Sequence, residues 1–237
     1  MYPAPRRKGY RPVAEASLTG TFAVPLDPTD VVTLTAVLDG LVAHRLWWDD
    51  RTWAQPAARR LIASGYLADA FAAGRLHGWP TVYTVWRGSA LTGVLLANQV
   101  NYGTDLSVHF CFFDRTLADK RRLTLNLMAQ AFDKLDLQVI RTEIPTYVSA
   151  LANWCRRKLG FRFEAEQRPL SRTPRRIGDT RAHEARQLTA EEAMLGSRKY
   201  RAILFEGRWH DKVLLSVTRD EFVRVYDEVF HERPLHD

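Results

Sequence analysis

The chain has 237 residues with 46% hydrophobic and 26% charged residues, a composition that allows a packed core and excludes a disordered or fibrous protein. Its formal charge is +7 and its pI about 9.6, with arginine supplying most of the positive charge. This charge indicates an anionic partner, such as nucleic acid, a ribosome or cofactor phosphates, or else arginine used generally as a surface cation.

The length predicts one α/β domain with extensions. No apolar run approaches the ~18 residues of a membrane span, and the first residues lack the apolar region of a secretory signal, so we expect a cytoplasmic protein. The two cysteines, Cys111 and Cys155, lie in apolar patterns. This favours buried free thiols over a disulfide or a metal site.

The N-terminal part predicts an arm, a strand and two helices. Residues 1–16 form a basic, proline-containing arm, and alternation over 17–25 indicates a first strand. A helix is expected after Thr29, which can cap it. A second helix is expected from Pro56, suited to a first turn, to Gly74, suited to a C-terminal cap.

The centre of the chain predicts a hairpin, a buried strand and a long helix. Thr81–Trp86 and Leu91–Val100 flank a turn that contains Gly88. Leu106–Asp114 is apolar enough for a strand that is buried on both faces. A helix from Leu117 to Leu135 follows.

A strand, a helix and a second strand come next. Val139–Ile144 reads as a strand that Pro145 ends, because proline cannot donate to a ladder. The following helix has an apolar stripe at helical spacing and Gly160 as its cap. The stripe consists of Val148, Leu151, Ala152, Cys155 and Leu159. A strand is expected over 161–166.

A polar insertion is predicted over 168–199. Its first part carries six arginines against two acids and lacks interleaved aromatic residues, which suggests phosphate contacts rather than base stacking. Arg172, Arg175 and Arg176 are therefore candidate anion-binding residues for nucleic acid. A protein interface and a solvated loop are the other interpretations.

The end of the chain predicts a short helix near 189–195, a hairpin of 201–205 with 212–218, and a helix over 220–230. The whole order predicts a central mixed β-sheet with helices on both faces, as one domain over 17–237.

Three segments carry a resemblance to a known family. Gln138–Phe163, with its Leu159-Gly160-Phe161 corner, resembles the carboxyl half of the GNAT (N-acetyltransferase) fold. Ala131–Leu135 (AFDKL) upstream strengthens the resemblance. The ending Gly207–Val217 is similar to the ribosomal-protein alanine acetyltransferase branch.

The resemblance implies an acetyl-CoA site. In the family, a strand matching Val108–Asp114 separates from its neighbour and binds the pantetheine arm through its backbone, while a glycine-rich turn into the next helix binds the pyrophosphate. Here that turn contains no glycine. A basic triplet would bind the phosphates by charge instead. The expected cofactor residues are Phe110, Cys111, Phe112, Phe113, Lys120, Arg121, Arg122 and Ser149, the last at the position of a family asparagine.

Candidate catalytic residues lie on the same strands and the following helix. Glu143 and Asp105 are candidate general bases, with His109 and Asp114 as further candidates. The tyrosine that protonates the leaving thiolate in the family falls at Cys155 or Arg156. Cys155 is therefore a candidate for that role.

Three functions remain open from the sequence. The first is transfer of an acetyl or other acyl group from coenzyme A to a primary amine by direct attack on the thioester, the acceptor being a protein N-terminus or a small amine. The second is a catalytically degenerate GNAT-fold binding protein in a larger assembly, because several family residues are missing. The third is an acyltransferase that modifies nucleobases, as a few phage proteins of this fold do. No metal-binding motif is present in the sequence.

Overall fold

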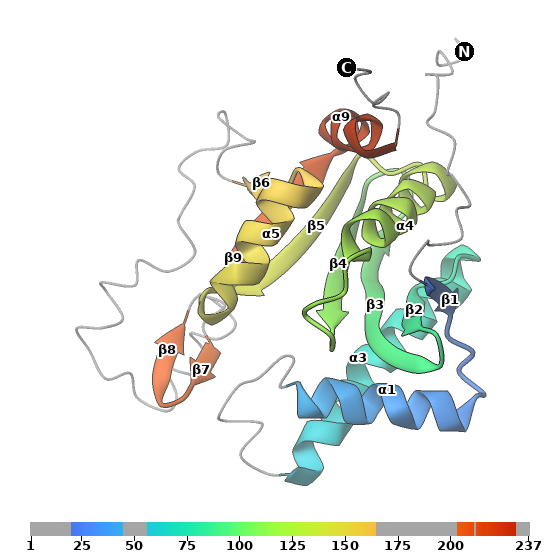
Figure 1. Cartoon of the computed structure of the whole chain (residues 1–237), viewed down its shortest axis with the longest axis vertical. Coiled ribbons are helices and arrows are strands. Elements are labelled where there is room, and N and C mark those ends of the chain that lie inside the picture. Colours follow the sequence, from blue (N-terminus) through green and yellow to red (C-terminus); the bar gives the residue numbers. More distant parts are fainter. Residues whose placement is uncertain (1–19, 45–55, 165–202, 211, 231–237) are drawn as a thin grey trace.

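A seven-stranded mixed sheet forms the centre of the structure, a computed structural model that describes residues 20–44, 56–164, 203–210 and 212–230 (Figure 1). The strand order is β1-β2-β3-β4-β5-β9-β6. Its strands are β1 (Thr21–Pro25), β2 (Val82–Arg87), β3 (Ala90–Asn101), β4 (Asp105–Phe112), β5 (Val139–Pro145), β6 (Arg162–Phe163) and β9 (Lys212–Thr218). Only β4 and β5 pair in parallel within this sheet; its other neighbours are antiparallel.

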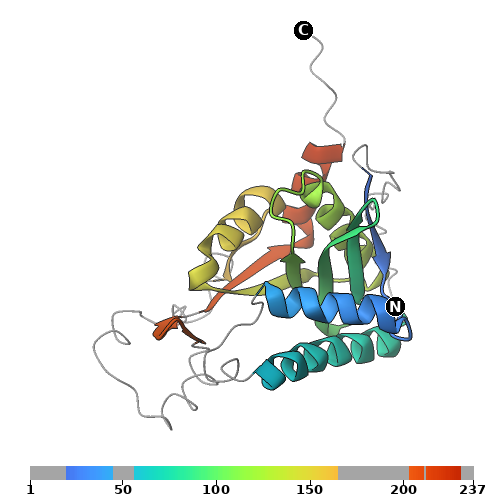
Figure 2. The same ribbon diagram turned by 60° about the horizontal axis from the view of Figure 1, so that its bottom comes forward.

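Helices cover both faces of the sheet, and Figure 2 shows α1 and α3 together on one side. The helices of that side are α1 (Val31–Ala43) and α3 (Pro56–His77). The other face carries α4 (Lys120–Lys134), α5 (Ser149–Leu159) and α9 (Arg219–Phe230), and a 3-10 turn, η1 (Thr146–Val148), precedes α5. Successive side chains of β4 point to opposite faces of the sheet. Phe110 packs with α4 and α5, while Cys111 packs with α1 and α3. The prediction that this strand is buried on both faces holds at Phe110 and Cys111, whereas Ser107 and His109 on the α1–α3 face are half-buried.

Gly160 ends α5 as the sequence predicts. Its φ is +79°, the left-handed conformation that glycine adopts without strain, and its N–H bonds to the Cys155 carbonyl. Three residues of the predicted stripe, Ala152, Cys155 and Leu159, are buried. The βαβ prediction is therefore confirmed, although β6 is shorter than the strand expected over 161–166.

The closing hairpin is a wrong prediction. β7 (Ile203–Phe205) pairs instead with β8 (Arg208–His210) in a separate two-stranded sheet. β9 then enters the main sheet between β5 and β6, and it pairs with β5 along its whole length. β9 thus has the seven-residue strand β5 as its partner, instead of the three-residue strand β7 that the sequence suggested.

Two predicted caps are also wrong. Asp30, rather than Thr29, caps α1, because the Asp30 carboxylate accepts a hydrogen bond from the Thr33 N–H at 3.0 Å. α3 continues past Gly74 to His77, and a Cβ at Gly74 would lie 2.7 Å from the Thr81 hydroxyl oxygen. Gly74 therefore permits close packing inside the helix rather than ending it.

The basic arm and the arginine-rich insertion, including Arg172, Arg175 and Arg176, lie outside the described residues. In the described part of the chain, no helix is long and apolar enough to cross a membrane.

Candidate functional site

The parallel pairing of β4 with β5 is short. It consists of Asp105 with Val139, Leu106 with Ile140, and Ser107 with Arg141. Both strands continue beyond this point, and Figure 1 shows them diverging. The edge of β4 that faces β5 has no ladder partner from Val108 to Phe112 among the described strands. The backbone groups on that edge therefore lie outside the β4–β5 ladder.

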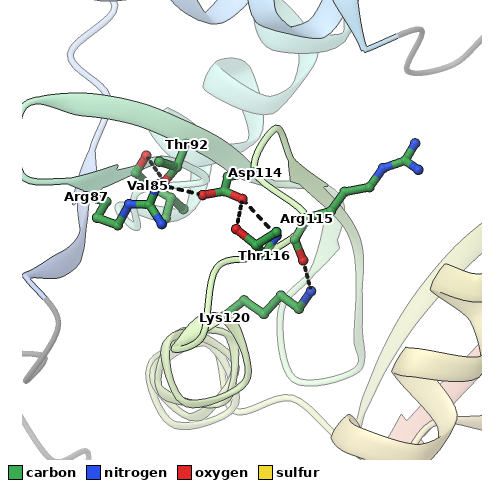
Figure 3. A network of polar contacts seen from close by, with 7 residues as sticks. All are labelled: Val85, Arg87, Thr92, Asp114, Arg115, Thr116 and Lys120. Carbon is green, nitrogen blue, oxygen red and sulfur yellow. Dashed lines mark hydrogen bonds and ion pairs between the residues drawn. The ribbon is translucent and has the colours of Figure 1, made fainter.

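A structured turn connects β4 to α4, and Figure 3 shows its polar contacts. The Asp114 carboxylate accepts hydrogen bonds from the Thr116 N–H (2.8 Å) and hydroxyl (2.6 Å), and it pairs with Arg87 at 3.0 Å. The Thr116 hydrogen bonds are the main cause of the lowered pKa of Asp114. A carboxylate held in this way shapes the turn, and its lowered pKa opposes the general-base role considered for it.

The three basic side chains at the start of α4, Lys120, Arg121 and Arg122, point in two different directions. The Lys120 ammonium donates to the Arg115 carbonyl at 2.8 Å and lies 5.9 Å from the centre of the Trp154 ring, so it stays beside the turn. The Arg121 guanidinium donates to the Lys158 carbonyl at 2.8 Å and lies 3.5 Å from a Glu228 oxygen.

Arg122 lies against the Phe230 ring of α9, with its guanidinium carbon 5.0 Å from the ring centre. Arg121 and Arg122 thus tie α4 to α5 and α9. Only Lys120 of the three faces the β4–α4 turn.

An aromatic wall stands beside the unpaired part of β4. The Trp154 ring of α5 makes edge contacts with Phe110 (6.1 Å between ring centres) and Phe112 (5.8 Å). The wall, Phe110, Phe112 and Trp154, lies on the sheet face that carries α4 and α5. Trp154 was not predicted, because it lies outside the apolar stripe expected for this helix and a single tryptophan carries no signal that marks the wall of a site.

The opposite face of the same opening is polar. Glu143 of β5 lies 3.5 Å from the Lys212 ammonium, and the Tyr66 ring of α3 makes an edge contact with His109 of β4 at 6.1 Å. Burial is the main cause of the raised pKa of Tyr66, and Glu143 and Asp69 raise it further. Burial, with a smaller contribution from Lys212, lowers the pKa of His109 to about 4, so this imidazole is neutral at pH 7.

An unsatisfied acceptor lies close to this polar group. Asn98 of β3 is directly opposite Ser107, and its side-chain Oδ1 is buried without a hydrogen-bond partner among the described residues. Cross-strand partners share a face of the sheet, so Asn98 is on the side of His109. A buried carbonyl oxygen of this kind is stabilised by an N–H donor.

Asp105 is engaged at the closed end of the opening. It forms an ion pair with Arg141 and accepts a hydrogen bond from the Asn101 amide at 2.6 Å. Arg141 also bonds to Glu164 at 3.3 Å. These contacts hold the last β4–β5 pairs together, which is a positioning function.

Four further predicted residues have side chains in other environments. Cys155 is fully buried in the core, and burial raises the pKa of its thiol. Cys111 is buried against α1 and α3, where burial raises its pKa to about 12. Phe113 stacks on His44 at 5.0 Å, and Ser149 is exposed at the start of α5.

The position of the family tyrosine is not filled by a residue that faces the opening. Arg156 lies over the Phe163 ring, 4.4 Å from its centre, at the edge of the sheet. Arg156 thus contacts the edge strand rather than the gap between β4 and β5, and Cys155 is enclosed in the core.

Solved structures with the same architecture have low sequence identity to this chain. The ribosomal L7/L12 alpha-N-protein acetyltransferase, solved with coenzyme A, matches with a TM-score of 0.53 and 14% identity over 87% of this chain and 98% of that one. A proposed acetyltransferase from Salmonella typhimurium, solved with acetyl-CoA, matches with a TM-score of 0.51 and 14% sequence identity. The match covers 84% of this chain and 94% of that one. A proposed acetyltransferase from T. thermophilus matches with a TM-score of 0.51 and 16% sequence identity, and the match covers 100% of both chains.

The chain has the GNAT fold. This confirms the predicted fold. No family model matches the sequence, and no curated protein matches it either. One of the similar structures is a ribosomal-protein N-acetyltransferase, the class that the segment Gly207–Val217 resembles. In the GNAT arrangement, the β4–β5 opening of this chain is the candidate site.

Proposed function

We propose that the protein is an acyl-CoA-dependent N-acyltransferase that uses the β4–β5 opening. The observation that carries the proposal is the end of the parallel ladder at Ser107 and Arg141, in a fold shared with structures that hold coenzyme A or acetyl-CoA. The acceptor is a primary amine, either on a small molecule or at a protein N-terminus. The N-terminal acceptor of the ribosomal enzyme supports the latter.

The residues of the opening fit the cofactor. The edge of β4 beyond the β4–β5 ladder, from Val108 to Phe112, would offer backbone donors and acceptors to an extended, amide-containing arm such as pantetheine. Lys120 places a positive charge beside the β4–α4 turn, where pyrophosphate would lie. Trp154 supplies an apolar wall along the same path. Acetyl-CoA would provide the acyl group as a thioester.

The polar face fits the amine. Free amines are protonated at neutral pH, so a base must remove a proton before the nitrogen can attack the thioester carbon. Glu143 carries that role in our proposal, because it lies on the part of β5 that has separated from β4. Asn98 Oδ1 would accept an N–H of the bound amine. The new bond joins nitrogen to the acyl carbon as the carbon–sulfur bond breaks, and coenzyme A leaves as the thiol.

Thiol release tests the proposal. The protein is incubated with acetyl-CoA, with and without a panel of primary amines that includes a diamine and peptides with free N-termini. We expect free thiol to form only with an accepted amine, together with the N-acetylated product by mass spectrometry. Thiol release at the same low rate with and without every amine would contradict an amine acyltransferase.

A second candidate function is a GNAT-fold binding protein without turnover. Two observations favour it: Arg121 contacts α5 and α9 rather than the turn, and Arg156, at the position of the family tyrosine, contacts Phe163 rather than the gap. This candidate predicts a folded protein that does not bind coenzyme A, whereas the enzyme predicts binding.

A further inference from the structure

A basic groove lies on the side of α5 that faces away from the β4–β5 opening. Residues from three elements line it: Arg156, Arg157 and Gly160 of the α5 end, Phe161 and Arg162 of β6 and its approach, and Glu221, Arg224 and Val225 of α9. It encloses about 680 Å³, within the roughly 300–1,000 Å³ range of ligand sites. Trp154 contacts β4 while Arg156 contacts Phe163 on the edge strand, so the groove and the opening are on opposite sides of α5.

The groove is strongly positive. Its lining contains four arginines and one glutamate, which leaves a net formal charge of +3. Glu221 is already engaged, since it accepts a hydrogen bond from the Thr218 hydroxyl at 2.8 Å and forms an ion pair with Arg162 at 3.0 Å. Arg157 and Arg224 are exposed, and neither forms an ion pair within the described part of the chain.

Stabilisation of the α5 C-terminus explains only part of this arrangement. Cations in the last turn of a helix interact favourably with its dipole, which accounts for Arg156 and Arg157. Arg162 and Arg224 belong to other elements, and Arg224 lies in the interior of α9. Their convergence with the α5 arginines around one concavity indicates an anionic ligand.

The lining favours phosphates over an acidic protein partner. Protein interfaces depend on exposed aromatic and aliphatic anchors at their centre, but the groove's one aromatic residue, Phe161, is only 2% exposed. Interfaces with nucleic acid are instead polar and rich in arginine, whose planar guanidinium forms two hydrogen bonds to one phosphate. A buried Phe161 also excludes base stacking, so recognition would involve the backbone alone.

We propose that this groove binds a single-stranded segment of nucleic acid through its phosphates, without sequence preference. A flexible strand can bend into a concave site that a rigid duplex cannot enter. The surface is independent of acyl transfer, and it would bring a nucleic acid or nucleoprotein close to the enzyme.

Fluorescence anisotropy with a labelled 20-nucleotide single-stranded RNA of mixed sequence, at 50 and 200 mM salt, tests the proposal on the full chain. The groove variant is Arg157→Gln/Arg224→Gln, and the matched control is Arg75→Gln/Lys134→Gln, which removes the same charge from exposed positions of α3 and α4. We expect the groove variant to bind on the order of tenfold more weakly at low salt. Its plot of log K against log salt should also be shallower by about 1.4, since each single-strand phosphate contact contributes about 0.7.

The control variant distinguishes a contribution of the groove from the effect of removing positive charge anywhere on the surface. It should keep the wild-type salt slope and bind within about twofold of wild type. Equal losses in the two double variants, or no salt-dependent binding by the wild type, would overturn the proposal. Equally tight binding of a 20-residue polyglutamate that the groove variant also loses would overturn it as well, in favour of an acidic protein partner. Circular dichroism confirms that both variants are folded.

Discussion

Ser107 of β4 and Arg141 of β5 form the last pair of the only parallel ladder in the seven-stranded sheet. Beyond them β4 remains bonded to β3 and β5 to β9, so each strand keeps one partner while the edges between them open. Arg141 also pairs with Asp105 and Glu164, and these contacts fix the point at which the separation begins. The position of the candidate site is therefore set by the end of the β4–β5 ladder, and not by a single residue.

Replacing the proposed base tests the chemistry on the polar face. Glu143→Gln keeps the shape of the side chain and removes the proton acceptor, so we expect kcat for amine acylation to fall about 10²-fold or more. Coenzyme A affinity should stay the same, because Glu143 lies on the face opposite the aromatic wall. Asp133→Asn, an exposed change on α4, is the control. A Glu143 variant with wild-type kcat would exclude this residue as the base.

The His109 environment predicts a pH dependence of stability. Its pKa is lowered to about 4 in the native state, from an unfolded value near 6.5. Between these values the unfolded chain binds a proton that the native protein does not, so the free energy of unfolding should fall as the pH drops from about 6.5 to 4. Urea unfolding across this range measures the slope.

His109→Gln should remove that contribution, and His77→Gln, at the end of α3, is the matched control. The imidazole accounts for about 1 to 3 kcal/mol between the two ends of the range. An unchanged slope in the His109 variant would show that the imidazole is not buried in its neutral form.

Gly160 carries the family corner, and its substitution tests the packing there. Gly160→Ala forces a left-handed conformation on alanine, which costs roughly 1–2 kcal/mol, and places a Cβ 2.8 Å from a methyl carbon of Val225. Gly88→Ala shares the positive φ but meets no atom within 4 Å. We expect the Gly160 variant to be less stable than the Gly88 variant by about 1 kcal/mol or more in urea unfolding. Equal losses would mean that α9 does not pack against this corner.

Arg121 should contribute to stability rather than to cofactor binding. Arg121→Ala removes a hydrogen bond to the Lys158 carbonyl and a contact with Glu228, and we expect a loss of about 1 kcal/mol because the side chain is partly exposed. Thermal unfolding measures the loss. Lys134→Ala, at an exposed position of the same helix, should have little effect.

The sequence was sufficient for features that depend on local pattern. The apolar spacing of α5 with glycine after it, and the recurring apolar residues of β4, each predict their element because burial follows helical or strand periodicity. The resemblance built on those elements predicted the GNAT fold correctly.

Features that depend on distant partners could not be predicted. β9 is separated from β5 by more than sixty residues, so the sequence pattern suggested the neighbouring β7 segment as its partner. Gly74 has the same sequence signal as a cap glycine, although its role is the close approach of Thr81.

The direction of each cation in the Lys120–Arg122 triplet depends likewise on α5 and α9, which follow it along the chain. The same is true of Trp154 and Tyr66, whose place beside the opening is set by the strands against which their helices pack.

Calorimetric titration with acetyl-CoA and with free coenzyme A tests whether the β4–β5 opening binds the cofactor, with Lys120→Gln beside Arg122→Gln. The two variants remove equal charge within one helical turn, but only Lys120 faces the β4–α4 turn. We expect binding by the wild type, on the order of tenfold weaker binding by the Lys120 variant, and no change in the Arg122 variant. A folded wild-type protein that binds neither ligand would contradict the claim that the β4–β5 opening is a coenzyme A site.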